Sequence, residues 1–369
     1  MPSCAAKPNE LLLVGVPGPD LDSATAARLR RLQPGGFILF GRNIISAAQL
    51  RRLTDDLRDL SATEPIITID QEGGRVSRLR LIGHEPPNAQ QLRQRGEPAL
   101  IAEHGRLTGR LLRLFGFNLD LCPVLDLSFD DEADNSLRGR CYGSSVEETI
   151  ANAEQFRAAM AAEGILSCGK HFPGYTFAGL DPHHELPRID RSRAELDGCE
   201  LAVFRAFADK VDSMMIGHAH YPCFEPNAAV PASLSSAVIR ECLVGELAFR
   251  GLVMTDDLDM GAILNTFSWE DTIQRAVRAG NHLIMICHRL EAAEEALGIL
   301  EAMPKADLDP TLAAVATFKQ RMAPPTAFSE QAHRDLDDAV WQLRVATLGE
   351  ELAQTRSAED GKRSPVEVY

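Results

Sequence analysis

The chain has 369 residues, of which 45% are hydrophobic and 25% are charged. This balance is typical of a globular protein and excludes a disordered one, and the length allows either one large barrel or two smaller domains. The formal net charge of −15 excludes a general polyanion binder, because such a protein needs many cations to neutralise phosphates. We therefore expect a small or neutral ligand and no nucleic acid.

The eight cysteines show no CxxC pair and no metal-ligand spacing. We expect them to be reduced, because Cys122, Cys168 and Cys287 lie in apolar runs, where a thiol behaves as a small hydrophobe. The first ten residues lack the apolar core of a signal peptide, and no run of 18 apolar residues occurs. These features predict a cytoplasmic protein that does not interact with a membrane.

Short apolar runs alternate with amphipathic stretches of helical period along most of the chain. The runs that predict strands are Leu11–Val16, Gly36–Phe40, Ile66–Asp70, Asn118–Cys122, Ile165–Lys170, Ser213–Gly217, Gly251–Thr255 and His282–Cys287. Alternating strands and helices favour a parallel sheet, and eight pairs match a closed (β/α)8 barrel. A doubly wound open sheet is the alternative, but VGVPGPD after the first run lacks the GxGxxG spacing.

We therefore predict an α/β protein with the fold of a single-domain (β/α)8 TIM barrel. The barrel is expected to occupy residues 11–350, including two extra helices between 305 and 350 that pack outside it. Residues 1–10 are predicted to be an N-terminal extension. Residues 351–369 are predicted to be a flexible polar tail, because this segment has little apolar surface to bury.

Ionisable side chains follow two of the predicted strands. The segment 165–187, ILSCGKHFPGYTFAGLDPHHELP, carries five of them within fifteen residues: Lys170, His171, Asp181, His183 and His184. The segment 251–261, GLVMTDDLDMG, places Asp256 and Asp257 directly after another strand. Because the carboxyl ends of barrel strands face a common mouth, we expect these side chains to converge on one site.

The KHFPG motif, His183 and TDDLDMGA together resemble glycoside hydrolase family 3, from about residue 10 to residue 300. More narrowly, the pattern is similar to single-domain bacterial β-N-acetylhexosaminidases that act on cell-wall fragments. The resemblance implies a retaining exo-β-N-acetylglucosaminidase that removes terminal GlcNAc through a covalent glycosyl-enzyme. It implies no metal and no organic cofactor. The implied substrate is a small carbohydrate, either a GlcNAc-containing muropeptide in peptidoglycan recycling or a chitooligosaccharide, and the implied protein is a monomer.

By the same resemblance, Asp256 is the nucleophile, His183 is the acid/base and Asp181 is its partner. Histidine suits this role, because its ordinary pKa near ~6.5 lets it donate and accept a proton near neutral pH. Asp181 would orient the imidazole ring and stabilise its protonated form. A helix N-cap is the structural alternative for Asp256, and Asp257 would suit it equally well.

The resemblance assigns five residues to the terminal sugar: Asp70, Arg78, Arg140, Lys170 and His171. A carboxylate beside an arginine can both accept from and donate to sugar hydroxyls, and lysine adds three donors. An ordinary rim salt bridge is the alternative for Asp70 and Arg78. Arg140 is preferred to Arg138, although the segment that carries it is about one residue shorter than the usual family pattern.

Several polar residues near the expected site are predicted to be structural. Asp120 and Asp126 would hold loop backbone amides, and Arg75 would have no role in binding. His218 and His220 share one face of a strand and could bind a metal, but hydrogen-bonded rim histidines are the favoured interpretation.

One stretch departs from the family pattern, because Tyr175 to Ala178 replace the usual His-Gly-Asp-Thr. The polar contacts that brace this loop in the family are then lost, and an aromatic pair takes their place. Three alternatives stay open. One is a related hydrolase that prefers another β-linked sugar. The second is a phosphorylase, because a neutral histidine repels phosphate less than a carboxylate would. The third is an inactive sugar-binding relative, which the altered loop allows.

Overall fold

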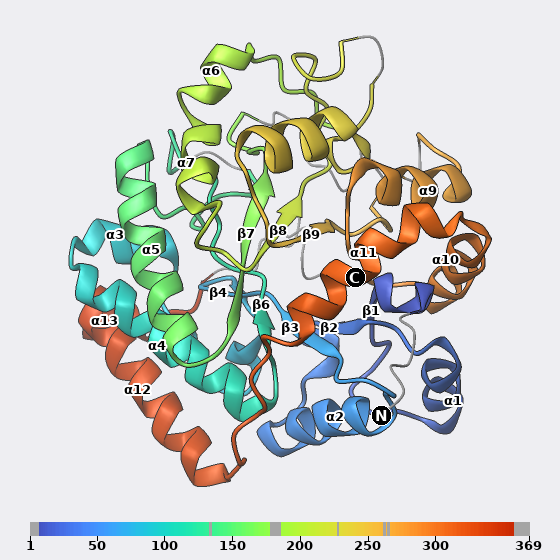
Figure 1. The fold of residues 1–369 in the computed structure, drawn as a ribbon. Helices are drawn as coiled ribbons and strands as arrows, with labels where there is room; N and C mark the ends of the chain where they lie inside the picture. Colours follow the sequence, from blue (N-terminus) through green and yellow to red (C-terminus); the bar gives the residue numbers. More distant parts are fainter. Residues whose placement is uncertain are drawn as a thin grey trace.

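The computed structural model describes residues 7–132, 135–177, 186–226, 229–260, 263 and 266–357. Within these residues, parallel strands form one eight-stranded sheet in the order β10-β1-β2-β3-β6-β7-β8-β9. A parallel bridge between Met254 and Leu283 joins β9 to β10, so the sheet closes on itself. The strands lie at the centre of the molecule and the helices surround them (Figure 1). The predicted (β/α)8 barrel is confirmed.

All eight barrel strands lie where the sequence predicts them. Their bounds are β1 Leu12–Gly15, β2 Gly36–Leu39, β3 Ile66–Ile69, β6 Leu119–Asp120, β7 Leu166–Phe172, β8 Ser213–Ile216, β9 Leu252–Thr255 and β10 Ile284–Ile286. Strand β7 runs two residues beyond its predicted end, so His171 and Phe172 also belong to the strand. A short antiparallel hairpin, β4 Gln71–Gly73 and β5 Val76–Ser77, follows β3 at the mouth of the barrel.

The outer layer is helical. The α-helices are α1 Ser23–Leu32, α2 Ala47–Asp59, α3 Ala89–Arg95, α4 Pro98–Phe115, α5 Val146–Ala162, α6 Arg193–Asp197, α7 Glu200–Phe207, α9 Trp269–Ala279, α10 Leu290–Ala302, α11 Lys305–Lys319, α12 Glu330–Leu348 and α13 Glu350–Ala353. Short 3-10 helices are η1 Pro8–Leu11, η2 Gly41–Asn43, η3 Arg78–Leu81 and η4 Ala232–Leu234, and η5 Ala237–Glu246 is a π-helix.

Helix α4 illustrates how the sequence defines these elements. Pro98 occupies the first turn, where its missing N–H is not needed, and Gly116 ends the helix in a left-handed conformation with φ of 86°. Ile101, Leu112 and Phe115 lie on its buried face and belong to the main hydrophobic core. The amphipathic pattern of this stretch therefore indicates which face of the helix packs against the barrel.

One amphipathic stretch does not form a single helix. The sequence AELDGCELAVFRAFADK, residues 194–210, has a helical period throughout, yet the structure divides it into α6 and α7. Cys199 between them has φ of −133° and ψ of −103°, which no helix allows. Gly198 precedes it, and glycine has a low helix propensity, which permits the break.

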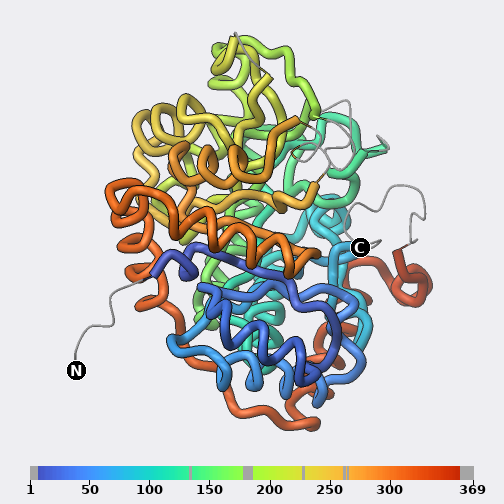
Figure 2. Tube along the Cα trace, turned by 90° about the vertical axis from the view of Figure 1, so that its right-hand side faces the viewer, coloured from blue at the N-terminus to red at the C-terminus, as the bar shows by residue number. Residues whose placement is uncertain are grey.

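The two extra helices expected between residues 305 and 350 are α11 and α12. Helix α11 lies beside η1 near the N-terminus (Figure 2). Helix α12 is tied to the segment after the β4–β5 hairpin, because Arg344 donates to the backbone and the side chain of Glu85 at 3.0 and 3.2 Å. The predicted tail is described only to residue 357, and the predicted N-terminal extension only from residue 7.

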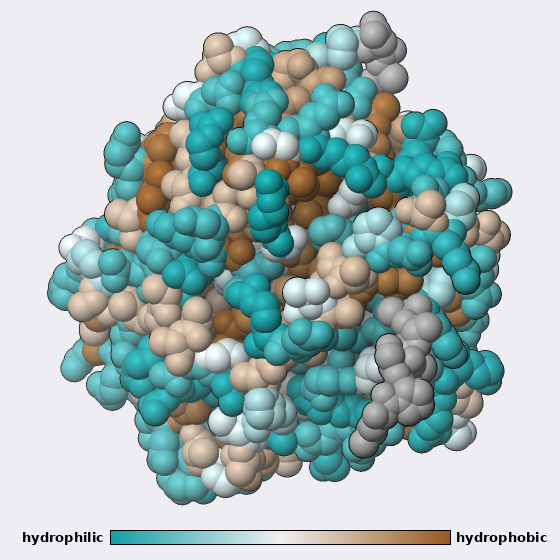
Figure 3. Space-filling model, in the orientation of Figure 1, coloured by the Kyte–Doolittle hydropathy of each residue, from teal (hydrophilic) through white to brown (hydrophobic). Residues whose placement is uncertain are grey.

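The polarity of the surface and the state of the cysteines are those that the composition leads us to expect. The face in Figure 3 is mostly hydrophilic, with apolar atoms visible mainly between polar side chains. Cys4 lies outside the described residues. The other cysteines are free thiols, as expected. No helix in the described part of the chain is both long and apolar enough to cross a membrane.

Candidate active site

A pocket of about 340 Å³ opens at the carboxyl ends of the barrel strands. Apolar side chains from four strands or their ends line it, namely Ile38, Leu121, Met215 and Met285. Five of the predicted site residues also line it: Asp70, Arg140, Lys170, His171 and Asp256. Arg78 joins them through Asp70, with Nη2 3.6 Å from Oδ2. Asp181, His183 and His184 lie outside the described residues.

A buried lysine organises one side of the pocket. Lys170 Nζ lies 2.7 Å from Asp70 Oδ1 and 2.7 Å from Glu72 Oε1. Glu72 in turn accepts two hydrogen bonds from Arg140, one from Nε and one from Nη2, each at 2.7 Å. The side chains of Glu72, Arg140 and Lys170 are more than nine-tenths buried, and that of Asp70 is 11% exposed. Asp70, Glu72, Arg140 and Lys170 therefore form one cluster of alternating charge.

The charges in this cluster keep one another ionised. Burial by itself would raise the pKa of Glu72, but Arg140 and Lys170 outweigh burial and hold that pKa below its ordinary value. Burial would likewise lower the pKa of Lys170, and the carboxylates of Asp70 and Glu72 hold it above its ordinary value. The pocket thus presents a permanent ammonium and guanidinium beside a carboxylate, a set that can donate to and accept from a polyhydroxylated ligand.

Glu72 is the member of the cluster that sequence reasoning missed. It lies two residues after Asp70 in an extended segment, and side chains at such spacing point to the same side of a strand. That spacing was the available signal. Its partners could not be read from the sequence, because Arg140 is 68 residues away along the chain.

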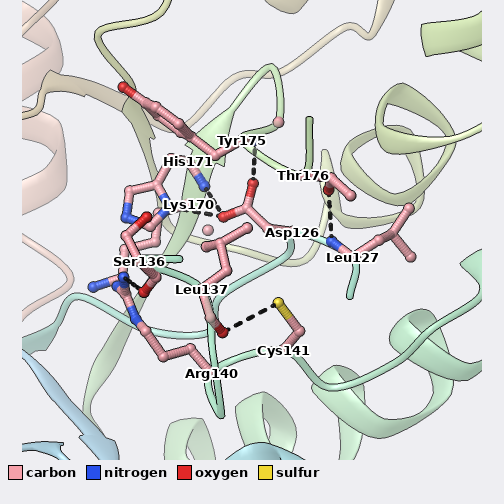
Figure 4. Close-up of polar contacts among 12 residues, drawn as sticks. Asp126, Leu127, Ser136, Leu137, Arg140, Cys141, Lys170, His171, Tyr175 and Thr176 are labelled. Carbon is pink, nitrogen blue, oxygen red and sulfur yellow. Dashed lines mark hydrogen bonds and ion pairs between the residues drawn. The ribbon is translucent and has the colours of Figure 1, made fainter. Parts of the chain in front are cut away.

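A second arrangement holds His171 in place. Asp126 Oδ2 accepts from His171 Nδ1 at 2.7 Å and from the His171 backbone N–H at 3.1 Å. Its Oδ1 accepts from the backbone N–H of Tyr175 at 2.7 Å, so this carboxylate lies between the ring and the loop (Figure 4). Because a carboxylate only accepts, the proton is on Nδ1 of His171. Asp126 holds backbone amides as predicted, and it also fixes the tautomer of a pocket-lining ring.

The loop that departs from the family pattern begins at Tyr175, and its first two side chains contact neighbouring segments. The hydroxyl of Tyr175 accepts from the backbone N–H of His218, and its ring packs edge-on against His171 with centroids 5.4 Å apart. Thr176 Oγ1 accepts from the backbone N–H of Leu127 at 3.1 Å. Tyr175 and Thr176, which differ from the family pattern, therefore brace the start of this loop.

The two aspartates after β9 have different surroundings. Asp256 lines the pocket, and its Oδ1 accepts from the backbone N–H of Asp257 at 2.8 Å. Asp257 Oδ1 accepts from the backbone N–H groups of Asp259 and Cys287, both at 3.0 Å, and its Oδ2 lies 3.2 Å from His288 Nε2. Asp257 therefore ties the end of β9 to the end of β10, and Asp256 is the carboxylate that the backbone presents to the pocket.

The remaining sequence interpretations agree with the geometry. His218 Nδ1 is 2.8 Å from Ser233 Oγ, and its Nε2 is 2.9 Å from the backbone oxygen of Asp257. His220 Nδ1 is 3.2 Å from the Val230 oxygen. Both imidazole rings are hydrogen bonded, which is the interpretation that the sequence analysis favoured.

Two arginines outside the pocket are held by other groups. Arg75 donates to the Ser136 oxygen at 2.9 Å. Arg138 is half-exposed and pairs with Glu132 at 3.1 Å, whereas Arg140 lines the pocket.

Asp120 is a buried carboxyl directly beneath the charged cluster. Its Oδ1 accepts from the Gln71 backbone N–H at 3.0 Å, and its Oδ2 has no hydrogen-bond partner within the described part of the chain. Burial raises the pKa of Asp120 to about 8, against the opposing effect of the Gln71 N–H. Asp120 is therefore protonated at neutral pH.

The first prediction concerns the charge of Glu72. Glu72→Gln keeps the shape but leaves Arg140 without its buried counter-charge and Lys170 with Asp70 alone, so we expect a loss of about 3 kcal/mol in unfolding free energy, measured by urea denaturation. The matched control is Glu154→Gln, which breaks a more exposed pair with Arg157 at 2.7 Å. We expect less than ~1 kcal/mol there. Equal losses in the two variants would contradict the structural role of the cluster.

The second prediction concerns Asp120. The folded protein keeps the Asp120 proton up to about pH 8, whereas the unfolded chain loses it near the ordinary pKa of 3.8. Between these pH values the folded state binds more protons, so the wild type loses stability as pH rises. Asp120→Asn removes this loss, and its stability relative to the wild type should increase from pH 4 to pH 8 in urea titrations. Parallel pH profiles would show that Asp120 is ionised in the folded protein.

The third prediction concerns Gly217, which faces the ring of Tyr175. A Cβ at Gly217 would lie 2.0 Å from Tyr175 Cε2. We expect Gly217→Ala to cost about 1–3 kcal/mol of stability and the added Tyr175→Ser change to recover part of it, as measured by thermal unfolding. Gly298→Ala is the control, because a Cβ there meets nothing within 4 Å. Additive losses in the double variant would rule out a clash with this ring.

Comparison with known proteins gives a consistent result. The model of the glycosyl hydrolase family 3 N-terminal domain matches residues 4–317. A β-hexosaminidase of Alkalilimnicola ehrlichii is 34% identical over 80% of this chain and 85% of its own length. A β-hexosaminidase of Vibrio cholerae is 34% identical over 79% of this chain and 87% of its own length.

Two solved structures extend the comparison to the fold. The family 3 β-N-acetylglucosaminidase of Paenibacillus sp. str. FPU-7 superposes with a TM-score of 0.85 and 31% identity, covering 94% of this chain and 69% of that one. Native NagZ of Neisseria gonorrhoeae superposes with a TM-score of 0.79 and 27% identity, covering 93% and 99%. Because the family model spans most of the sequence and the relatives exceed 30% identity over about four-fifths of it, the chain belongs to glycoside hydrolase family 3 and is a glycoside hydrolase.

Proposed function

We propose that this protein is a retaining exo-β-N-acetylglucosaminidase, a β-hexosaminidase that removes terminal non-reducing GlcNAc. The observation that carries the proposal is the pocket, in which Asp256 shares one cavity of about 340 Å³ with the buried cluster around Lys170. The two bacterial relatives are named β-hexosaminidases, which supports the coarser activity, and the name of the Paenibacillus enzyme supports GlcNAc as the sugar.

The shape of the pocket favours the exo mode of attack. Its inner end is lined by apolar strand residues, including Met215 and Met285 in the barrel interior. A sugar chain could therefore enter from the mouth but could not pass through the barrel, which is packed with side chains. Only a terminal residue would reach the charged cluster.

In this mechanism the cluster binds the terminal sugar. Lys170 and Arg140 would donate to its oxygens, and Asp70, which lies beside Lys170 and Arg78, would accept from a hydroxyl. His171 carries its Nδ1 proton toward Asp126, which leaves Nε2 for the ligand. The binding groups come from β3, the loop after β6, and β7, so the sugar would be held from several sides of the mouth.

Asp256 would then attack the anomeric carbon. A retaining enzyme forms a covalent bond between its carboxylate and the sugar while an acid protonates the leaving oxygen. We assign the acid to His183 with Asp181 as its partner, a proposal that rests on the family resemblance because both lie outside the described residues. Water, deprotonated by the same histidine, would hydrolyse the intermediate and restore free Asp256.

The finer biological assignment also rests on resemblance. We propose that the leaving group belongs to a cell-wall fragment, so that the enzyme would act in peptidoglycan recycling, with a chitooligosaccharide as the other candidate substrate. The cytoplasmic location and the monomeric state stay predictions from the sequence.

The fourth prediction tests the nucleophile with an aryl β-GlcNAc and, as the sugar control, an aryl β-glucoside. We expect the wild type to hydrolyse only the GlcNAc compound and Asp256→Ala to lose several orders of magnitude in kcat. Added azide should restore turnover of Asp256→Ala and give the α-glycosyl azide, because the small anion replaces the carboxylate on the same face. His183→Ala should lose activity toward poor leaving groups most strongly.

Asp257→Asn is the matched control, because it changes the neighbouring carboxylate. Azide should not rescue it. Equal activity of Asp256→Ala and wild type would exclude Asp256 as nucleophile. Phosphate-dependent release of a sugar 1-phosphate would identify a phosphorylase, and GlcNAc binding without any turnover would identify a sugar-binding relative.

A further inference from the structure

His288 follows β10 and lines the pocket, with its side chain 24% exposed. Its Nδ1 lies 3.1 Å from Nη1 of Arg42, and its Nε2 lies 3.2 Å from Oδ2 of Asp257. The face of the ring packs near Phe40, with ring centroids 5.5 Å apart. None of the sequence motifs pointed to this residue, and the reaction described above does not use it.

The partners of His288 determine which nitrogen carries its proton. Arg42 can only donate, so Nδ1 of His288 accepts and is unprotonated. Nε2 then carries the proton, and it lies 3.2 Å from Oδ2 of the Asp257 carboxylate. Both ring nitrogens thus face protein groups. The geometry disfavours a direct role for His288 in binding sugar hydroxyls.

Arg42 is itself fixed in position. Its Nε donates to the Val16 oxygen at 3.0 Å, and Nη2 donates to the Cys287 oxygen at 2.5 Å. Its guanidinium also lies 4.5 Å from the centre of the Phe40 ring, within the range of a cation–π contact. Since Arg42 is held by backbone oxygens at the ends of β1 and β10, it can hold the orientation of the imidazole of His288.

Asp257 links His288 to Asp256, the proposed nucleophile. Asp257 Oδ2 lies 3.2 Å from His288 Nε2, and Asp257 Oδ1 accepts two backbone N–H groups. The backbone N–H of Asp257 donates to Asp256 Oδ1 at 2.8 Å. A chain of polar contacts therefore runs from Arg42 after β2, through His288 after β10, to Asp256 after β9.

We propose that His288 is a positioning residue, whose Nε2–H anchors Asp257 so that the Asp257 backbone N–H holds the Asp256 carboxylate at the angle needed for attack. This inference rests on the proposed function, in which Asp256 is the nucleophile. A nucleophile displaced by about 1 Å can lose about 10²-fold in rate. The groups that bind the sugar lie on β3, the loop after β6, and β7, so displacement of Asp256 need not weaken binding.

The fifth prediction follows because Asp256 and the sugar-binding groups lie on different segments. His288→Leu keeps an apolar wall but removes both hydrogen bonds, so we expect kcat to fall by about 10- to 100-fold. KM for the aryl β-GlcNAc and the inhibition constant of free GlcNAc should change by less than about twofold. His288→Gln should recover most of kcat, because an amide can accept from Arg42 and donate to Asp257.

His84→Leu is the matched control. His84 pairs with Asp337 at 2.9 Å and also packs on an aromatic ring, that of Trp341, but it lies away from the pocket. This variant should keep the wild-type kcat. Thermal unfolding of all variants would show whether each is folded under the assay conditions.

Several outcomes would overturn the inference while leaving the proposed function intact. Wild-type kcat in His288→Leu would do so, as would a rise in KM alone, which would make His288 a sugar-binding residue. Failure of His288→Gln to recover activity, or an equal loss in His84→Leu, would indicate a general structural effect. If the wild type itself hydrolyses no aryl β-GlcNAc, the proposed function fails, and this inference fails with it.

Discussion

The rest of the site depends on the burial of one ammonium group at the mouth of the barrel. Lys170 is almost wholly inaccessible, and an isolated charge in such a place would be too costly to keep. Two carboxylates within 2.7 Å of Nζ make its burial possible, and Arg140 then balances the second of them. Because β3, the β4–β5 hairpin, the loop after β6 and β7 each contribute one charge, the cluster also fixes how these segments sit around the pocket.

A similar arrangement recurs at His171 and His288, the histidines that line the pocket within the described residues. His171 Nδ1 is hydrogen bonded to Asp126, and His288 Nε2 lies 3.2 Å from Asp257 Oδ2. Each of these carboxylates also accepts backbone N–H groups, and they come from the loops beside it. Each carboxylate therefore fixes both a ring and a loop, so that the mouth is preorganised without requiring long regular structure.

This pattern explains what the sequence could and could not predict. The barrel strands were predictable because buried parallel strands read as apolar runs, and Lys170, His171 and Asp256 because they end such runs. Asp126 was recognised only as an amide acceptor, and Glu72 and His288 were not recognised at all. Their roles depend on partners that are 68 residues away for Glu72 and 45 for Asp126. Sequence spacing reports which way a side chain points, but it does not report which distant group it meets.

Burial accounts for the raised pKa of Asp120. The cations of Lys170 and Arg140 are already paired with Asp70 and Glu72, so an ionised Asp120 would have no cation of its own among them. The Gln71 N–H alone is too weak to offset that burial, and Asp120 keeps its proton instead. Because Lys170 and Arg140 are already paired with carboxylates of the protein, a ligand at this cluster has to supply hydrogen bonds but no counter-ion, which suits an uncharged sugar.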